Sequence, residues 1–134
     1  MNDDNMDKIP SAKKSLARIW AALFHSLNGL RFAITNETAF MQEVSFYVVL
    51  LIVLYLMPLS VIFKCILLFA NTIVLLVELL NSAIESVVDM ASPGYNLLAK
   101  RAKDLSSAAV LISIALSILL WLIAFACVIY GVDA

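Results

Sequence analysis

The sequence predicts an all-α membrane protein in which an amphipathic helix precedes three transmembrane helices. Of its 134 residues, 63% are hydrophobic and only 14% are charged, whereas soluble domains contain roughly 45–50% and about 25%. The mean hydropathy is +0.99, and three uncharged or nearly uncharged runs are long enough to cross a bilayer. This composition excludes an ordinary soluble globular protein, a disordered chain and a nucleic-acid binder.

The N-terminal part combines a polar tail with an amphipathic segment. Residues 1–8 are polar and acidic and are predicted to be a solvated tail. In residues 9–43, apolar side chains recur every three or four positions from Ile9 to Leu30, whereas Lys13 and Arg18 lie away from that stripe. We therefore expect an interfacial helix, with its apolar face in the membrane.

The remainder, residues 44–134, is the predicted three-span transmembrane domain. The expected spans cover residues 44–63, 65–88 and 105–130. Of the nine Lys and Arg residues, five precede the first span, three lie between the second and third, and only Lys64 lies between the first and second. Because basic loops stay in the cytoplasm, we expect a cytoplasmic N-terminus and an external C-terminus.

Four polar residues mark one face of the second span. Glu78, Asn81, Glu85 and Asp89 follow one another at spacings of three and four, which places them on one side of a helix. A charged group within a span costs about 2.5–3.5 kcal/mol even on a lenient scale. These carboxylates must therefore face protein, water or a metal, and catalysis, ion transport and structural hydrogen bonding all remain open.

Three blocks of sequence give the chain a family resemblance. The segment ELLNSAIE, from Glu78 to Glu85, resembles the signature of the small prokaryotic integral-membrane diacylglycerol kinases. Residues 29–43 are similar to that family's first block, and residues 101–111 are similar to its third. The blocks keep their order and spacing over roughly residues 18–125.

The resemblance implies an ATP-dependent lipid kinase of the bacterial inner membrane. It implies that diacylglycerol is phosphorylated to phosphatidic acid by a homotrimer, with sites at the subunit boundaries and no nucleic-acid partner. Glu78 would be the catalytic base, and Asn81 would orient Glu78 or a phosphate. Glu37 and Glu85 would hold the Mg²⁺ that bridges the phosphates of ATP.

The same resemblance assigns two further sets of residues. The nucleotide-binding set also includes Glu37 and Glu85, and its other members are Arg18, His25, Tyr95, Asn96, Lys103 and Asp104. The lipid-substrate set includes Glu78 as well, and its other members are Arg31, Ala39, Phe40, Met41, Gln42, Glu43, Ser107 and Trp121.

Two alternatives remain open from the sequence. The first is the same chemistry on a different alcohol, undecaprenol. The second is a small non-enzymatic membrane oligomer in which Glu78 and Glu85 line a polar axis. Only the two kinase hypotheses predict phosphoryl transfer from ATP.

Overall fold

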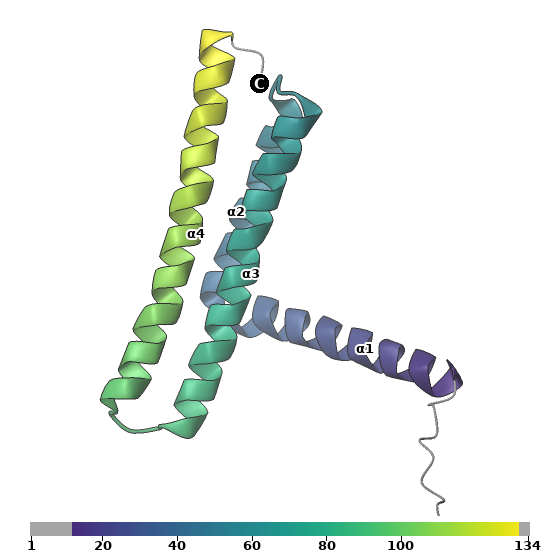
Figure 1. The fold of residues 1–134 in the computed structure, drawn as a ribbon, viewed down its shortest axis with the longest axis vertical. Coiled ribbons are helices and arrows are strands. Elements are labelled where there is room, and N and C mark those ends of the chain that lie inside the picture. Colours follow the sequence, from purple (N-terminus) through teal and green to yellow (C-terminus); the bar gives the residue numbers. More distant parts are fainter. Residues whose placement is uncertain (1–11, 132–134) are drawn as a thin grey trace, which may run out of the picture. The chain divides into compact units, whose positions relative to one another are not determined.

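A computed structural model describes residues 12–131, with side chains from Leu16 onward. The predicted tail, residues 1–8, lies outside this range. The helices of the described chain are α1 (Ala12–Asn36), α2 (Thr38–Leu56), α3 (Val61–Ala91) and α4 (Leu97–Tyr130) (Figure 1). The all-helical prediction is confirmed. The chain forms two compact units, one ending at Phe32 and one beginning at Ala33.

The first unit contains most of α1. The large apolar side chains that form its predicted stripe are exposed, including Ile19, Trp20 and Leu27. The helix ends at Asn36 because Glu37 adopts an extended backbone, with φ −101° and ψ 103°. The predicted segment 9–43 is thus divided at Glu37, and its last residues belong to α2.

Three long apolar helices, α2, α3 and α4, confirm the predicted number of spans. The first span ends earlier than the predicted residue 63, because α2 stops at Leu56. Pro58 disfavours helical backbone at the preceding residue, and Met57 is extended accordingly, with φ −71° and ψ 137°. Ser60 then caps α3 by accepting a hydrogen bond from the Phe63 amide at 3.2 Å.

The connection from α3 to α4 is also defined by its capping residues. Helix α3 ends at Ala91, shortly before Pro93. The side-chain Oδ1 of Asn96 accepts hydrogen bonds from the amides of Leu98 and Ala99 at 2.8 and 3.3 Å, as a helix N-cap does. Helix α4 therefore starts eight residues before the predicted third span, which begins at residue 105.

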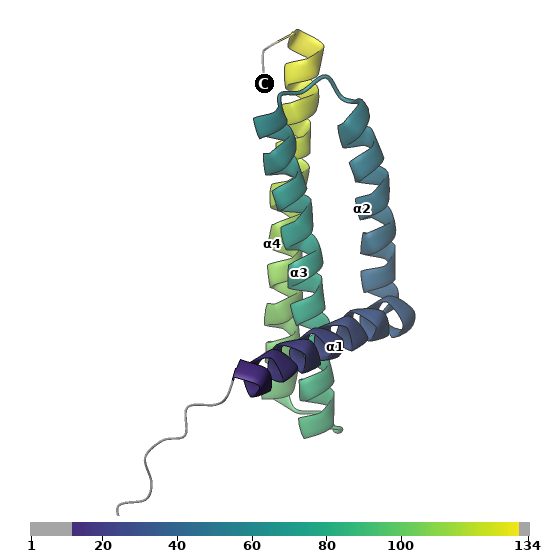
Figure 2. The same ribbon diagram turned by 90° about the vertical axis from the view of Figure 1, so that its right-hand side faces the viewer.

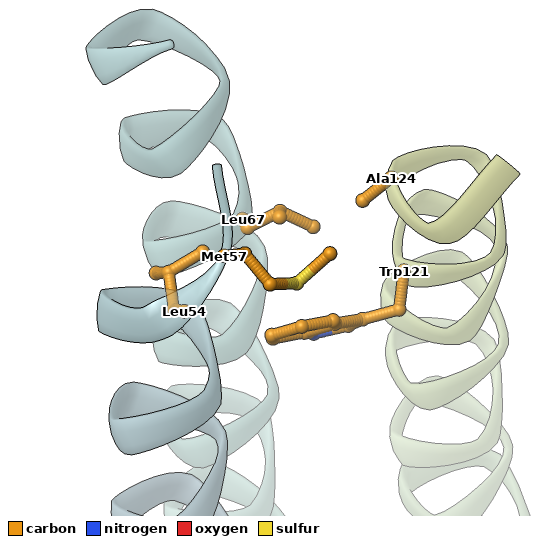
Figure 3. Close-up of a cluster of buried hydrophobic side chains, with 5 residues drawn as sticks. All are labelled: Leu54, Met57, Leu67, Trp121 and Ala124. Atoms are coloured by element: carbon orange, nitrogen blue, oxygen red, sulfur yellow. The ribbon is translucent and has the colours of Figure 1, made fainter. Parts of the chain in front are cut away.

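Within the second unit, α3 runs antiparallel to α4 along most of its length, and α2 contacts α3 less extensively (Figure 2). The apolar core lies near the turn that joins α2 to α3. Figure 3 shows Trp121 and Ala124 of α4 facing Leu67 of α3, with Leu54 and Met57 beside them. The buried apolar side chains of the unit are therefore concentrated at its α2–α3 end.

The three helices differ in length, and this difference determines the depth of the polar residues. Helix α2 has 19 residues, α3 has 31 and α4 has 34. At 1.5 Å per residue, α2 alone matches a hydrocarbon core about 30 Å thick. Glu78 is the eighteenth residue of α3, so it lies level with the first turn of α2, and the rest of α3 extends beyond the end of that helix.

Candidate functional site

The predicted polar face of α3 is buried at Glu78 and Asn81, half-buried at Glu85 and exposed at Asp89. Glu78, Asn81 and Ser82 are 5%, 8% and 9% exposed, and Asn71, two turns before Glu78, is 3% exposed. Polar residues normally avoid such positions unless they have partners or a function. This row of buried polar residues on α3 is therefore a strong candidate for the functional site of the chain.

Glu78 is the centre of a group of carboxylates. It lies within electrostatic range of Glu85, on the same helix, and of Glu37, which precedes α2. Glu43 of α2 also interacts electrostatically with Glu78. Glu37, Glu43 and Glu85, which come from two parts of the sequence, thus each interact electrostatically with Glu78.

Two polar atoms in this group have no partner among the described residues. The Asn81 side chain donates from Nδ2 to Oε1 of Glu85 over 3.5 Å, whereas its Oδ1 is buried without a hydrogen bond. Oε2 of Glu43 is buried and unpartnered as well. Unsatisfied oxygens of this kind provide acceptors for a hydroxyl proton or a cation.

An ion pair lies beyond this group, at the end of α3. Nζ of Lys103 on α4 is 2.6 Å from Oδ1 of Asp89, and Lys103 also interacts electrostatically with Glu85. Asp104 forms a separate, exposed pair with Lys100 at 2.8 Å. Sequence reasoning placed Asp89 on the polar face but assigned it no site role, since its partner on α4 becomes visible only in three dimensions.

The other nucleotide residues are placed as follows. Arg18 and His25 lie on α1 in the first unit. Tyr95 is 88% exposed in the α3–α4 connection. Asn96, next to it, uses its side-chain oxygen to cap α4.

A cavity of about 720 Å³ lies between α2, α3 and α4 on the apolar side of Glu78. Its walls are mostly aliphatic and aromatic. Five members of the predicted lipid-substrate set line it: Ala39, Gln42, Glu43, Glu78 and Trp121. This volume and apolar lining are typical of small-molecule and lipid sites.

The remaining members of the lipid-substrate set lie outside the lining of this cavity. Arg31 belongs to α1. Phe40 is buried in α2, and Met41 and Ser107 are exposed. The predicted set is therefore divided between the cavity wall and other parts of the chain.

A second polar network, which sequence reasoning missed, crosses the cavity wall. Oδ1 of Asn71 accepts hydrogen bonds from Oγ of Ser117 at 2.8 Å and from Nε1 of Trp121 at 3.0 Å. Nearby, the hydroxyls of Tyr47 and Thr72 lie 3.0 Å apart. An asparagine in the middle of an apolar run is a visible sequence signal, but its partners are 46 and 50 residues away.

The donor chemistry of the site is compatible with Mg²⁺. Glu37 and Glu85 supply carboxylate oxygens, and Mg²⁺ in phosphoryl-transfer sites usually takes one or two carboxylates together with substrate phosphates. Among residues 12–131, no three His, Cys, Asp or Glu side chains gather as a ready-made metal cage.

Comparison with known proteins identifies the family of the chain. Residues 24–125 match the prokaryotic diacylglycerol kinase family. The diacylglycerol kinase of Escherichia coli K12 is 41% identical over 106 residues, which cover 79% of this chain and 87% of the relative. The Helicobacter pylori enzyme is 33% identical over 114 residues (85% and 89%), and the Pseudomonas aeruginosa enzyme is 39% identical over 106 (79% and 86%). The predicted resemblance is thus confirmed, and the chain belongs to the prokaryotic diacylglycerol kinase family.

Proposed function

We propose that this membrane kinase transfers the γ-phosphate of ATP to the free hydroxyl of diacylglycerol, which yields phosphatidic acid and ADP. The observation that carries the proposal is the position of Glu78. Its side chain lines the apolar cavity and lies within electrostatic range of Glu85 and Glu37. The Glu78 carboxylate thus borders the apolar cavity, which suits a lipid. It also lies near the carboxylates of Glu37 and Glu85, which suit a cation bound to phosphate.

In the proposed reaction, Glu78 accepts the proton of the lipid hydroxyl. The hydroxyl oxygen then forms a bond to the γ-phosphorus. At the same time, the bond between the γ-phosphorus and the β–γ bridging oxygen breaks, and its electron pair leaves with ADP. A positioned base of this kind typically contributes 10²- to 10⁴-fold to a rate. Asn81, which is hydrogen-bonded to Glu85, orients Glu78 or a phosphate.

Glu37 and Glu85 are the residues that would hold Mg²⁺. When bound, the cation offsets negative charge on the phosphates during transfer. These two side chains carry hard oxygen donors, and both already interact electrostatically with the proposed base. Their own contribution is to present carboxylate oxygens beside Glu78 that a phosphate-bound cation would bind.

Lys103 and Asp104 are the proposed nucleotide contacts on α4. Lys103 offers a cation to phosphate oxygens, and its pair with Asp89 holds it at the level of Glu85. The exposed position of Tyr95 suits a contact with ATP arriving from water. Arg18, His25 and Asn96 complete the proposed nucleotide set.

The lipid is proposed to enter the cavity with its acyl chains among the aliphatic walls and its hydroxyl at Glu78. Gln42 and Glu43 lie on the α2 side of this position. Arg31, Phe40, Met41 and Ser107 complete the proposed lipid-substrate set.

We also propose a homotrimer in the inner membrane, with a cytoplasmic N-terminus and an external C-terminus. Phe46, Phe69 and Leu111, one from each spanning helix, are 70%, 68% and 68% exposed, as expected for helices that face lipid or other subunits. The exposed apolar side chains of α1 support a position at the membrane surface. Assembly would close the open side of the cavity.

The experiment is a phosphoryl-transfer assay with purified protein in mixed micelles. Labelled ATP is offered with diacylglycerol or with undecaprenol, each with and without Mg²⁺. We expect strong, Mg²⁺-dependent labelling of diacylglycerol. Preference for undecaprenol would keep the mechanism and change the acceptor, whereas labelling of neither lipid by a folded oligomer would favour the non-enzymatic alternative.

A further inference from the structure

Asn71 has one side-chain atom satisfied twice and another not satisfied at all. Its Oδ1 accepts hydrogen bonds from Ser117 and Trp121, while its Nδ2 is buried without a partner. The oxygen and the nitrogen of the amide are unambiguously assigned, because the indole of Trp121 can only donate and therefore must face the oxygen. The N–H groups of Asn71 consequently point elsewhere, in a residue that is only 3% exposed.

The residue that carries the unpartnered donor lies in the wall of the cavity. Asn71 and Glu78 both line that cavity. They are seven residues apart on α3, which places them on one face and roughly 10 Å apart along the helix axis. An unmade hydrogen bond is costly in such apolar surroundings, so a donor retained here points to an acceptor supplied by the occupant of the cavity.

A diacylglycerol molecule provides an acceptor at a suitable distance. About six bonds separate its free hydroxyl oxygen from an ester carbonyl oxygen, a reach of roughly 6–7 Å when extended. One hydrogen bond of about 2.8 Å at each end brings the total to roughly 12 Å. This reach is comparable to the axial separation of Asn71 and Glu78, once the offset of the two side chains is included.

We propose that Nδ2 of Asn71 donates a hydrogen bond to an ester carbonyl of the bound lipid, which makes Asn71 a specificity-determining residue for diester acceptors. The inference rests on the proposed function, because it assumes that diacylglycerol occupies the cavity with its hydroxyl at Glu78. The terminal torsion of asparagine is soft, so in the proposed complex a rotation about it brings the buried Nδ2 to the cavity surface.

The test compares a diester with a diether substrate. Initial rates of phosphorylation of 1,2-dioctanoylglycerol and 1,2-di-O-octylglycerol are measured in mixed micelles for the wild type, Asn71→Leu and Asn71→Ala. The diether keeps the hydroxyl and both chains but lacks the carbonyls. We expect the wild type to favour the diester, and both variants to lose roughly three- to tenfold of that preference, as for one neutral hydrogen bond.

Ser117→Ala is the matched control, because it removes a hydrogen bond to the same side chain without removing the Nδ2 donor. It is expected to retain the wild-type diester-to-diether ratio. The proposal is overturned if the Asn71 variants slow both lipids equally, since that result indicates a purely structural role, or if the wild type shows no diester preference. Failure of the wild type to phosphorylate either lipid would instead remove the proposed function itself.

Discussion

Replacement of Glu78 by Gln separates the catalytic role of this residue from its effect on stability. The substitution keeps the size of the side chain and removes its capacity to accept a proton. If Glu78 is the base, turnover falls by 10²- to 10⁴-fold. The same change removes a negative charge from the neighbourhood of Glu43, Glu85 and Glu37, and so we expect a more stable protein.

The size of the stability gain follows from where Glu78 lies. An ionised acid at the centre of a membrane span costs about 2.5–3.5 kcal/mol. Glu78 is only 5% exposed, but it lies level with the first turn of α2 and hence near the edge of the hydrocarbon. That cost falls toward the membrane interface, and the amide should therefore increase the free energy of unfolding by roughly 1 kcal/mol or less.

Both effects are measurable on the same preparation. Turnover is followed by transfer from labelled ATP to diacylglycerol, and the free energy of unfolding by titration with a denaturing detergent. Asp104→Asn makes the same charge change at an exposed ion pair, where a stability change within about 0.5 kcal/mol is expected. Near-normal turnover of Glu78→Gln would refute the assignment of the base, and a loss of stability would refute the electrostatic reasoning.

Three further substitutions test the surroundings of Glu78. Glu85→Gln is expected to raise the Mg²⁺ concentration needed for half-maximal rate or to abolish activity, and an unchanged Mg²⁺ titration would contradict its role as a ligand. Lys103→Ala should raise the KM for ATP with little change in stability, because its partner Asp89 is largely exposed; an unaltered KM would count against phosphate binding. Trp121→Phe removes the donor to Asn71 and should lower the free energy of unfolding by about 0.6–1.7 kcal/mol, whereas no change in a detergent titration would mean that the hydrogen bond carries no net stability.

The sequence was sufficient for the number of helices and for the polar face of α3, because both depend on local patterns. Apolar runs identify spans, and spacings of three and four identify a face. The ends of the helices were harder to predict. Pro58 lay inside the predicted first span, yet it ends α2, because its preference for an extended preceding residue outweighs the apolar character of the residues around it.

Contacts between distant residues could not be predicted in this way. The pair Asp89–Lys103 and the bonds from Asn71 to Ser117 and Trp121 depend on the register of α3 against α4. Apolar helices of similar composition can slide along one another, and no local pattern specifies one register. The role of Asn96 as an N-cap was equally hidden, because it depends on α4 beginning at Leu97, whereas the predicted span begins at residue 105.

In the proposed mechanism, the unequal helix lengths allow one short chain to bind a lipid from the membrane and ATP from water. Helix α2 is just long enough to cross the hydrocarbon, whereas α3 and α4 continue for more than ten further residues. The apolar cavity therefore lies where all three helices are present, and Glu85, Asp89 and Lys103 lie where α2 has ended. Glu78 occupies the level between these regions, where a lipid hydroxyl can approach from one side and a phosphate from the other. Lengthening α2 by two turns at its N-terminus would move this boundary by about 11 Å and should separate the two substrates even with every site residue intact.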